Sequence, residues 1–543
     1  MRRRNILTAL GLVAALAGPW PGAWRVARAQ ASDTLAQLDG RFVRRLDIVS
    51  RTIFDPPPEH GRGFYVFANR LHVRTRRSTV RGALVFREGS PWSESRRAES
   101  ERHLRSLAFL LPDSVIAAPA GDDSVDVRVV THDNWTTSPE FGLESGGGQR
   151  FSSFSFIERN FLGLGTSLAV SYRNDVSGIS RLASLEDDQL FGSHWRGRVT
   201  ASRGSAGRSE GGLLLLPFWA DDAPRSLGGD WQRDHVGADL FSGGRLAARV
   251  TGHYEHATLL WGAGGLENGA IRRLVVSLEM RDRSLATTVP YASATPVFTR
   301  AAEDLRVRRL AGELRFLRPR FLVRHGIDLM DRAEDIDIGR SFSLKGGFAP
   351  RFLGSTADEG FVQARLELGH DAGRLGFGLL RAGMRSRYRR APRELLGDVT
   401  ARWVHQPGER WTALAAVAGS AGREMPADFQ LTLGGLSGLR AFSVHELTGT
   451  EAWRGNAELR WIGVRDWLRL VSLGVAGFWD AGRVWGPGSE ARGWRQDVGF
   501  GLRLSLPHSA LNAVARFDVA WPIPPAAGGR GGPAYSFGSG QAF

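Results

Sequence analysis

The chain has 543 residues, which is more than one ordinary domain holds and indicates two domains plus processing segments. Hydrophobic residues make up 42% of the chain, which excludes disorder throughout, and the absence of cysteine excludes a disulfide scaffold, a thiol nucleophile and a cysteine-ligated metal site. Lys+Arg is 71 and Asp+Glu is 56, which gives a net charge of +15 that is carried almost entirely by arginine.

The first 29 residues are predicted to be a signal peptide. Three arginines at positions 2–4 precede a short apolar run at 6–17, and Ala27-Arg28-Ala29 supplies the small-x-small cleavage pattern. A membrane-anchoring helix is the weaker interpretation, because glycine and proline at 18–22 end the run before it reaches about 20 residues. We therefore expect an exported protein that begins at Gln30 and has a linker over residues 30–41.

Residues 42–134 are predicted to form one small α+β domain. A strand is expected at 43–50, a helix after Thr75, and a second helix that Ser93 caps and that runs to 108. Two further strands are expected at 115–117 and 125–130. The predicted order is β-α-α-β-β, and the apolar positions of the last strand are Val125, Val127 and Val129.

From residue 141 onward the helical pattern gives way to a strict alternation of apolar and polar residues. A soluble β-sandwich would alternate in the same way, so alternation alone does not distinguish a sandwich from a transmembrane barrel. The alternation recurs to the end of the chain, its apolar face is rich in aromatic residues, and Phe543 ends the chain with Tyr535 and Phe537 at the same parity. These features favour a transmembrane antiparallel β-barrel over residues 135–543. At ~10 residues per strand plus turns, this segment has room for about 16 strands. The predicted fold class is therefore mostly β.

Two runs of residues near the C-terminus carry a family resemblance. Residues 433–442 read Leu-Gly-Gly-Leu-Ser-Gly-Leu-Arg-Ala-Phe, and residues 477–482 read Gly-Phe-Trp-Asp-Ala-Gly. They resemble the signature loop and the receiving strand of the Omp85 superfamily, the bacterial surface antigen D15 or barrel-assembly group. The resemblance implies a loop in the barrel lumen that contains Gly438, Arg440 and Phe442, and an acceptor strand that contains Asp480 and Gly482. The sequence departs from the family pattern at Ala441, where glycine is usual.

Strand parity agrees with this implication. Asp480 shares its strand face with Ala476 and Phe478, opposite to Val475 and Trp479. A guanidinium inside a confined lumen needs a fixed acceptor, and a bidentate bond to a carboxylate supplies both geometry and energy. We therefore predict that Arg440 pairs with Asp480. Two unrelated charges in a wet lumen would contribute at most about 1 kcal/mol.

The N-terminal domain resembles a single POTRA domain. The matching residues include Asn69-Arg-Leu-His72, Gly89 and Glu99-Ser-Glu101, and Glu158-Arg-Asn160 resembles the first barrel hairpin of the family. The resemblance implies that the domain lies in the periplasm and receives unfolded clients by adding a strand to its sheet. The candidate client-binding strand contains Val125, Val127 and Val129, and the predicted signal in the last barrel strand is Tyr535, Phe537 and Phe543.

The resemblance implies an outer-membrane protein of a Gram-negative-type bacterium that assists the insertion and assembly of other β-barrel proteins. Its seam is expected to join Glu140–Leu143, or the strand that follows, to Ala534–Phe543. Implied partners are unfolded outer-membrane or secreted polypeptides, outer-membrane lipid, lipopolysaccharide and accessory periplasmic lipoproteins. No cofactor, metal, enzymatic step or nucleic acid is implied, and the arginine excess is expected to meet anionic clients or lipopolysaccharide phosphates. A translocation pore of the two-partner-secretion type and a passive porin-like barrel remain alternatives.

Overall fold

A computed structural model describes residues 38–146, 149–175, 177–290, 304–426, 428–435, 438–487, 489, 493–510, 514–523 and 532–541. The predicted signal peptide, most of the predicted linker and Phe543 lie outside these residues. No helix in the described ranges is long and apolar enough to cross a membrane.

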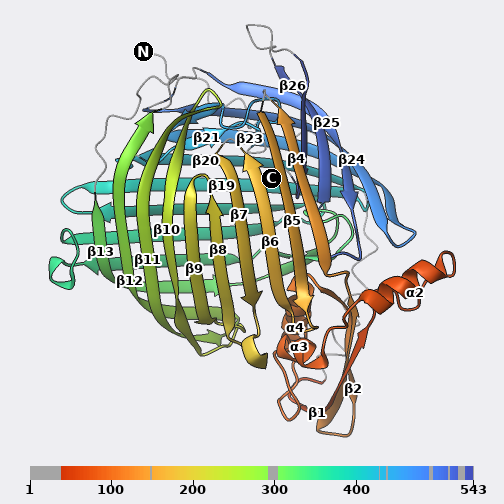
Figure 1. The fold of residues 1–543 in the computed structure, drawn as a ribbon. Helices are drawn as coiled ribbons and strands as arrows, with labels where there is room; N and C mark the ends of the chain where they lie inside the picture. Colours follow the sequence, from red (N-terminus) through yellow and green to blue (C-terminus); the bar gives the residue numbers. More distant parts are fainter. Residues whose placement is uncertain are drawn as a thin grey trace.

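The N-terminal part is a three-stranded sheet with helices packed on it (Figure 1). Its elements are β1 (Phe42–Arg51), α2 (Arg62–Leu71), α3 (Arg77–Gly82), α4 (Glu94–Ser106), β2 (Leu110–Pro119) and β3 (Ser124–Asp133). The sheet order is β1-β3-β2, with β3 parallel to β1 and antiparallel to β2. The Ser93 hydroxyl caps α4 by accepting from the backbone N–H of Arg96 at 3.2 Å.

Helix α2 was not predicted from the sequence, and it adds a third helix to the expected order. Its packed side chains are Tyr65 and Ala68, whereas Phe64 and Phe67 are exposed. Phe64, Phe67, Ala68 and Leu71 follow the spacing of an amphipathic helix, so the sequence carries a signal for α2 that the expected order did not use.

The larger part of the described chain is one closed barrel of twenty strands (Figure 1). In chain order they are β4 (Thr137–Gly146), β5 (Gln149–Phe161), β6 (Thr166–Asp175), β7 (Gly178–Asp187), β8 (Arg196–Gly204), β9 (Gly207–Leu216), β10 (Arg225–Ser242), β11 (Arg245–Glu267), β12 (Ala270–Pro290), β13 (Leu305–Arg318), β16 (Arg340–Ala349), β17 (Glu359–Asp371), β18 (Phe377–Tyr388), β19 (Pro392–Gly408), β20 (Trp411–Arg423), β23 (Glu451–Trp467), β24 (Val471–Trp485), β25 (Arg495–Ser505), β26 (Val514–Ile523) and β27 (Ala534–Ser539). Three single-turn 3₁₀ helices, η1 (Leu190–Gly192), η2 (Arg351–Leu353) and η3 (Gly373–Leu375), lie in connections between them.

The predicted number of about 16 strands is therefore too low. The estimate assumed longer connections than the chain uses. The end of β11 at Glu267 and the start of β12 at Ala270 are separated by two residues, for example. Tight hairpin turns of this kind leave room for more strands in the same length of chain.

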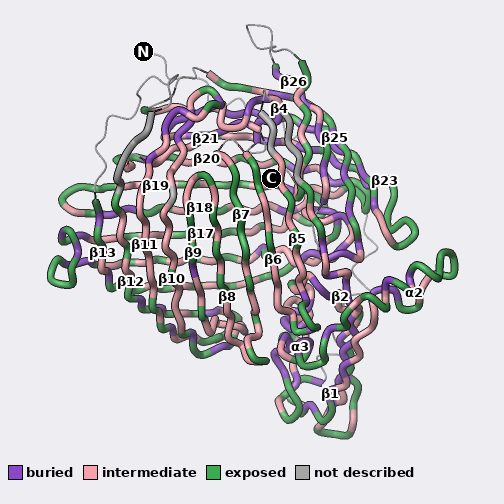
Figure 2. The backbone as a smooth tube through the Cα atoms, in the orientation of Figure 1, coloured by how far each residue is buried: buried purple, intermediate pink, exposed green. Residues whose placement is uncertain are grey.

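The two faces of the barrel wall differ as the alternation predicts. On β24, Val475 and Trp479 are 43% and 41% exposed on the outside, whereas Ala476, Phe478 and Asp480 are buried on the inside. Figure 2 shows the same alternation of buried and exposed positions along the wall strands. The outer face of the barrel is thus apolar and the inner face is polar, which is the arrangement of a barrel that is surrounded by lipid.

Two short hairpins interrupt the succession of wall strands. The inner hairpin, residues 319–339, contains β14 (Phe321–Arg324) and β15 (Glu334–Asp337) and lies between β13 and β16. The lumen loop, residues 424–450, contains β21 (Leu431–Leu433) and β22 (Leu447–Gly449) and lies between β20 and β23. Because antiparallel wall strands alternate in direction, the inner hairpin enters from the end that carries the N-terminal domain and the lumen loop from the opposite end.

Candidate functional site

Arg440 of the lumen loop and Asp480 of β24 form a buried bidentate ion pair. Arg440 Nε donates to Asp480 Oδ2 at 2.8 Å, and Nη2 donates to Oδ1 at 3.0 Å. The Arg440 guanidinium also lies over the Phe478 ring, 3.3 Å from its centroid. Both charged side chains are at most 1% exposed. The fork of the guanidinium is therefore fixed by two parallel hydrogen bonds and by the aromatic face below it.

Arg440 belongs to a larger buried cluster of charges. Its Nη1 donates to Glu458 Oε2 at 3.1 Å and to Asp518 Oδ2 at 3.3 Å. Glu458 also accepts from Arg460 and Arg503 through its other oxygen, at 2.7 and 3.2 Å. Strands β23, β24, β25 and β26 thus contribute to one network of alternating charges. In this lumen cluster each buried charge has partners of opposite sign, which offsets the cost of taking it out of water.

The backbone of the lumen loop allows this close approach. Gly438 has a φ of 109°, a conformation that favours glycine, and its carbonyl oxygen accepts from Asn456 Nδ2 at 3.1 Å. Ala441, the departure from the family pattern, is not among the described residues with positive φ, and its N–H donates to Asp497 Oδ2 at 3.2 Å. Alanine at this position therefore needs no strained backbone.

Phe442 and Gly482 seat the lumen loop by packing. Phe442 lies in a buried apolar cluster of the loop, β23 and β24, which also contains Leu433, Leu439, Leu447, Ala452 and Val484. A Cβ atom placed on Gly482 would lie 3.0 Å from Leu433 Cδ1 and 3.2 Å from Leu439 Cδ1. Glycine at 482 thus lets the loop contact the wall strand directly.

The inner hairpin is bound to the wall from within the lumen. Ile327 is completely buried and packs with Phe377, Val404 and Leu414 of three neighbouring wall strands. Arg460, a member of the lumen cluster, donates to the Ile327 carbonyl oxygen. Arg402 of β19 holds Asp328 in a bidentate pair at 3.0 and 2.6 Å. The hairpin and the lumen loop therefore share one polar network.

The same hairpin contacts the N-terminal domain. Arg105 of α4 pairs with Asp335 of β15, and Arg332 donates to the carbonyl oxygens of Leu107, Ala108 and Leu110 at 3.4, 3.1 and 2.8 Å. Burial lowers the pKa of Arg332 to about 10. These contacts fix the end of α4 and the start of β2 to a segment that reaches into the barrel.

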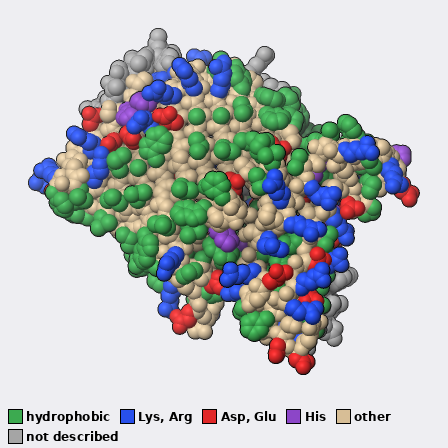
Figure 3. All heavy atoms as spheres, turned by 60° about the horizontal axis from the view of Figure 1, so that its bottom comes forward, with side chains coloured by type: hydrophobic (Ala, Val, Ile, Leu, Met, Phe, Trp, Pro, Cys, Tyr) green, Lys and Arg blue, Asp and Glu red, His purple; other side chains and the backbone are tan. Residues whose placement is uncertain are grey.

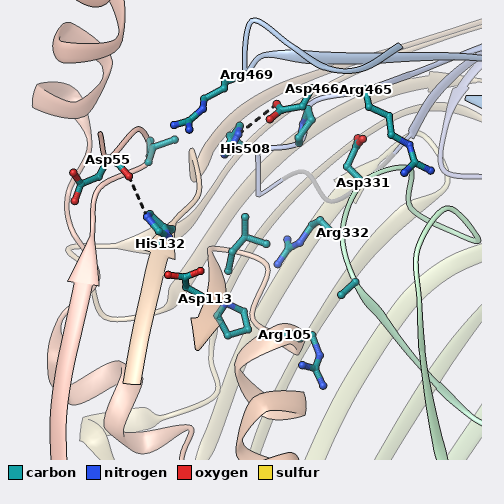
Figure 4. A pocket seen from close by; sticks show the side chains of 15 residues that line it. Asp55, Arg105, Asp113, His132, Asp331, Arg332, Arg465, Asp466, Arg469 and His508 are labelled. Atoms are coloured by element: carbon teal, nitrogen blue, oxygen red, sulfur yellow. Dashed lines mark hydrogen bonds and ion pairs between the residues drawn. The ribbon is translucent and has the colours of Figure 1, made fainter. Parts of the chain in front are cut away.

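A cavity of about 580 Å³ lies at this junction (Figure 4). Residues 111–113 of β2, Asp331 and Arg332 of the hairpin, and wall residues near Arg465 and His508 line it. His132 forms a hydrogen bond with the Asp55 carbonyl oxygen at 3.3 Å, and His508 Nε2 lies 3.5 Å from Asp466 Oδ1. All four residues line the cavity. In the described ranges no group of three or more His, Asp or Glu is placed to hold a metal ion.

The strand predicted to bind clients is not at an edge of its sheet, and this prediction is wrong. Strand β3 is flanked by β1 and β2, and Val125, Val127 and Val129 are at most 1% exposed in the domain core. A strand that is paired on both sides has no free N–H or C=O groups for an added strand. On the far side, β1 is partly covered by residues 89–92, because the Val43 N–H donates to the Ser90 carbonyl oxygen and the Val43 carbonyl oxygen accepts from the Gly89 N–H. Strand β2 is therefore the edge strand whose outer side is left without a paired strand.

The barrel closes between its first and last strands through a short seam. Only Tyr535 with Ser145 and Ser536 with Glu144 are paired between β27 and β4 in the described residues. By contrast, all ten residues of β4 pair with β5, and all six residues of β27 pair with β26. The seam thus lies beyond the expected Glu140–Leu143. Tyr535 and Phe537 are 50% and 37% exposed on the outer face beside it.

Sequence reasoning missed the partners of Arg440 other than Asp480. Asn456, Glu458 and Arg460 lie at two-residue spacing on β23 and face the lumen, as the alternation of that strand indicates. The alternation shows that they face inward, but not which residues of the other strands they meet. The role of the inner hairpin has no signal in the sequence beyond its interruption of the strand pattern.

The fold and the site define a class: a closed transmembrane β-barrel that carries a small α+β domain at one end and a loop bound in its lumen through a buried arginine. In the comparison with protein families, residues 406–543 match the Omp85 superfamily domain. The Omp85 resemblance of the two runs near the C-terminus is thus confirmed, and the matched segment contains Arg440, Asp480 and the seam strand β27. No curated protein matches the chain.

Solved structures with a similar fold include BamA from Haemophilus ducreyi lacking POTRA domains 1–3, with 15% identity, a TM-score of 0.39 and coverage of 92% of this chain and 84% of that one. CdiB from Acinetobacter baumannii has 13% identity, a TM-score of 0.41 and coverage of 93% and 74%. CdiB from Escherichia coli has 14% identity, a TM-score of 0.43 and coverage of 92% and 76%. At these values the likeness assigns no activity to this chain.

Proposed function

We propose that this protein lies in the outer membrane and assists the insertion of other β-barrel proteins through the seam between β27 and β4. The short seam is the observation that carries the proposal. Two residue pairs join the strands there in the described chain, whereas neighbouring strands pair along their length. Because unpaired backbone in hydrocarbon costs several kcal/mol per group, the weakest line of pairing is where a closed barrel opens most easily.

The N-terminal domain is proposed to act as a POTRA domain that receives the unfolded client in the periplasm. The outer side of β2 offers unpaired backbone groups, and Ile116 is 57% exposed on it. Residues 111–113 of the same strand line the junction cavity, so an added strand would lie next to the mouth of the barrel. Unfolded outer-membrane polypeptides are the proposed clients, and lipid, lipopolysaccharide and accessory lipoproteins are proposed partners.

A passive porin-like barrel is less well supported. The lumen loop and the inner hairpin both occupy the lumen, and buried ion pairs bind each of them to the wall. Segments bound in this way narrow the lumen, whereas a porin lumen is a water-filled channel. A translocation pore would require both segments to move, which makes it the alternative that the experiment below separates from an insertase.

The proposal is tested by locking the seam. The chain has no native cysteine, so Glu144→Cys with Ser536→Cys places one disulfide across the seam at a paired position. The matched control is Phe141→Cys with Phe154→Cys, which lie opposite each other on β4 and β5. Both proteins are placed in liposomes, a urea-unfolded barrel client is added, and its folding is followed by the gel-mobility shift of folded barrels.

We expect the seam lock to abolish acceleration of client folding, reduction to restore it, and the β4–β5 lock to have no effect. Acceleration that survives the locked seam would contradict lateral insertion. Absence of acceleration by the unlocked protein, together with steady ion conductance, would favour the pore instead.

A further inference from the structure

Helix α2 exposes an apolar stripe that no part of the described chain covers. Phe64, Phe67 and Leu71 are 57%, 58% and 60% exposed. Their spacing of three and four residues places them along one side of the helix. Three large apolar side chains in a row on a ten-residue helix form a contiguous patch of the kind that marks an interaction surface.

The stripe is not a sign of a loosely packed helix, because a different side of α2 is firmly held. Tyr65 and Ala68 are buried against Ile53 and Phe54. The Asn69 side chain accepts from the Phe54 N–H at 3.1 Å and donates to its carbonyl oxygen at 2.8 Å. The orientation of the stripe is therefore fixed by the packing of these neighbouring residues.

The helix lies at the rim of the barrel. The Tyr65 hydroxyl donates to the carbonyl oxygen of Leu468, which lies in the turn between β23 and β24. Figure 1 shows α2 projecting sideways from the domain at this level, away from the three-stranded sheet. Around the same turn Trp467 and Leu468 are 58% and 44% exposed, and Leu473 on the outer wall is 42% exposed. The helix that carries the stripe is thus attached next to exposed apolar residues at the rim of the barrel.

Basic side chains accompany the stripe. Arg70 is exposed on the helix, and Arg469 beside it donates to the Pro56 carbonyl oxygen at 3.1 Å. Figure 3 shows hydrophobic and arginine side chains next to each other on this projecting arm. Aromatic residues on one side of a short helix with arginine at its border are typical of helices that lie in a membrane interface, where the apolar side enters the acyl boundary and the cations meet lipid phosphates.

We propose that α2 is an interfacial anchor, with Phe64, Phe67 and Leu71 buried in the leaflet on the domain side of the membrane that surrounds the barrel. The anchor holds the N-terminal domain at the rim, next to the turn of β23 and β24. This inference rests on the transmembrane barrel and not on the proposed insertion of clients. Lipid is the occupant because α2 is bonded to the β23–β24 turn, where the exposed apolar residues of the barrel already meet lipid.

The absence of native cysteine allows a direct test in lipid nanodiscs of phosphatidylethanolamine and phosphatidylglycerol. Phe67→Cys and, as a matched control, Asp122→Cys at the exposed turn between β2 and β3 are each labelled with an environment-sensitive fluorophore. At position 67 we expect a blue shift, quenching by nitroxides placed shallowly on the lipid chains, and loss of quenching by aqueous iodide. At position 122 we expect the reverse.

A second variant tests the stripe without disturbing the packed side of the helix. Phe64→Ser, Phe67→Ser and Leu71→Ser are combined, and amide hydrogen exchange over residues 62–71 is followed in nanodiscs, with Ile116→Ser as the control. We expect faster exchange in the triple variant and no change over this segment in the control. Iodide quenching at position 67 in lipid would overturn the proposal. Protection that appears only after an unfolded client is added would overturn it too, because the occupant would then be a polypeptide.

Discussion

Arg105 of α4 and Asp335 of β15 are separated by 230 positions in the chain and form a bidentate ion pair, with Nε to Oδ2 at 2.6 Å and Nη2 to Oδ1 at 2.7 Å. This pair joins the N-terminal domain to the hairpin inside the barrel. Farther along the hairpin, the Ile327 carbonyl oxygen accepts from Arg460, and Arg460 shares Glu458 with Arg440. Contacts therefore run without a gap from the domain, through the hairpin, to the lumen loop at the opposite end of the barrel.

Such a path can couple the domain to the lumen loop only if one of its elements has two arrangements. Events at the domain and at the loop must then both shift the equilibrium between these arrangements. The inner hairpin is the candidate element, because it contacts both the domain and the lumen cluster. A client that displaces the domain would first disturb the Arg105–Asp335 pair and the carbonyl contacts of Arg332.

Replacement of Arg440 by alanine is expected to destabilise the barrel by about 3–5 kcal/mol, because it leaves the carboxylates of Asp480, Glu458 and Asp518 buried without a shared partner. Arg440→Lys should cost less, since the charge remains and the bidentate fork is lost. The midpoint of urea unfolding, read from the gel shift of the folded barrel, measures both. The control is Arg272→Ala, whose partner Glu267 is 3.6 Å away and 70% exposed. Equal midpoints for the two alanine variants would contradict the prediction.

Gly482→Val is expected to displace the lumen loop from the wall, because even a Cβ atom at this position meets Leu433 and Leu439 at 3.0 and 3.2 Å. Overpacking of this kind costs roughly 1–3 kcal/mol. The same substitution at Gly477 on β24 should be tolerated, since a Cβ atom there has nothing within 4 Å. Amide exchange of residues 431–433 and 447–449 should rise in the first variant alone. Unchanged exchange at Gly482→Val would show that the loop is not seated by this contact.

The Arg105–Asp335 pair is expected to couple the domain to the hairpin. Arg105→Gln and Asp335→Asn are made singly and together, and the free energy of unfolding of each protein is measured. The side chains are 17% and 14% exposed, so we expect a coupling energy of about 1–2 kcal/mol, above that of an exposed pair. Arg44 with Asp126, 59% and 36% exposed, provides the control cycle. Coupling energies that are equal in the two cycles would remove the pair from the proposed path.

The contact of α4 with the turn between β9 and β10 is expected to weaken as the pH rises. Burial, with smaller contributions from Asp221 and Asp222, raises the pKa of Glu99 to about 7, although its carboxylate accepts from the Asp221 N–H at 2.7 Å. The folded state therefore favours the protonated acid. Its contribution to stability is fully present below the unfolded pKa of 4.5 and is lost as the pH rises through 7, by on the order of 3 kcal/mol.

Thermal unfolding at pH 5 and pH 8 tests this dependence, with Glu99→Gln as the reference. We expect the loss of stability between pH 5 and pH 8 to be larger in the native protein than in the variant. The burial of His103 lowers its pKa and opposes the trend at acidic pH in both proteins. A native protein and a variant with the same pH dependence would show that Glu99 does not titrate in this range.

The alternation of residues along β24 is enough to place Asp480 on the inner face of a barrel strand, because side chains of a strand point to its two sides in turn. The same reasoning places Asn456, Glu458 and Arg460 inward. It does not show that Arg503 and Asp518 join them, since strand register and neighbourhood are properties of the closed sheet. The number of strands was underestimated for a different reason, because short turns leave only a weak pattern in the sequence and the connections were expected to be longer.

The amino-acid sequence by itself determined the mostly β fold, the preceding α+β domain, the inward face of Asp480 and the resemblance that identifies Arg440. Local periodicity and short motifs carry this information within a few residues. The tertiary structure alone decided that β3 is central and β2 is the edge, that the seam has two paired positions, and that a hairpin 230 positions from α4 binds it. These features depend on which distant segments meet when the barrel closes, and contacts between distant segments leave no periodic trace in the chain.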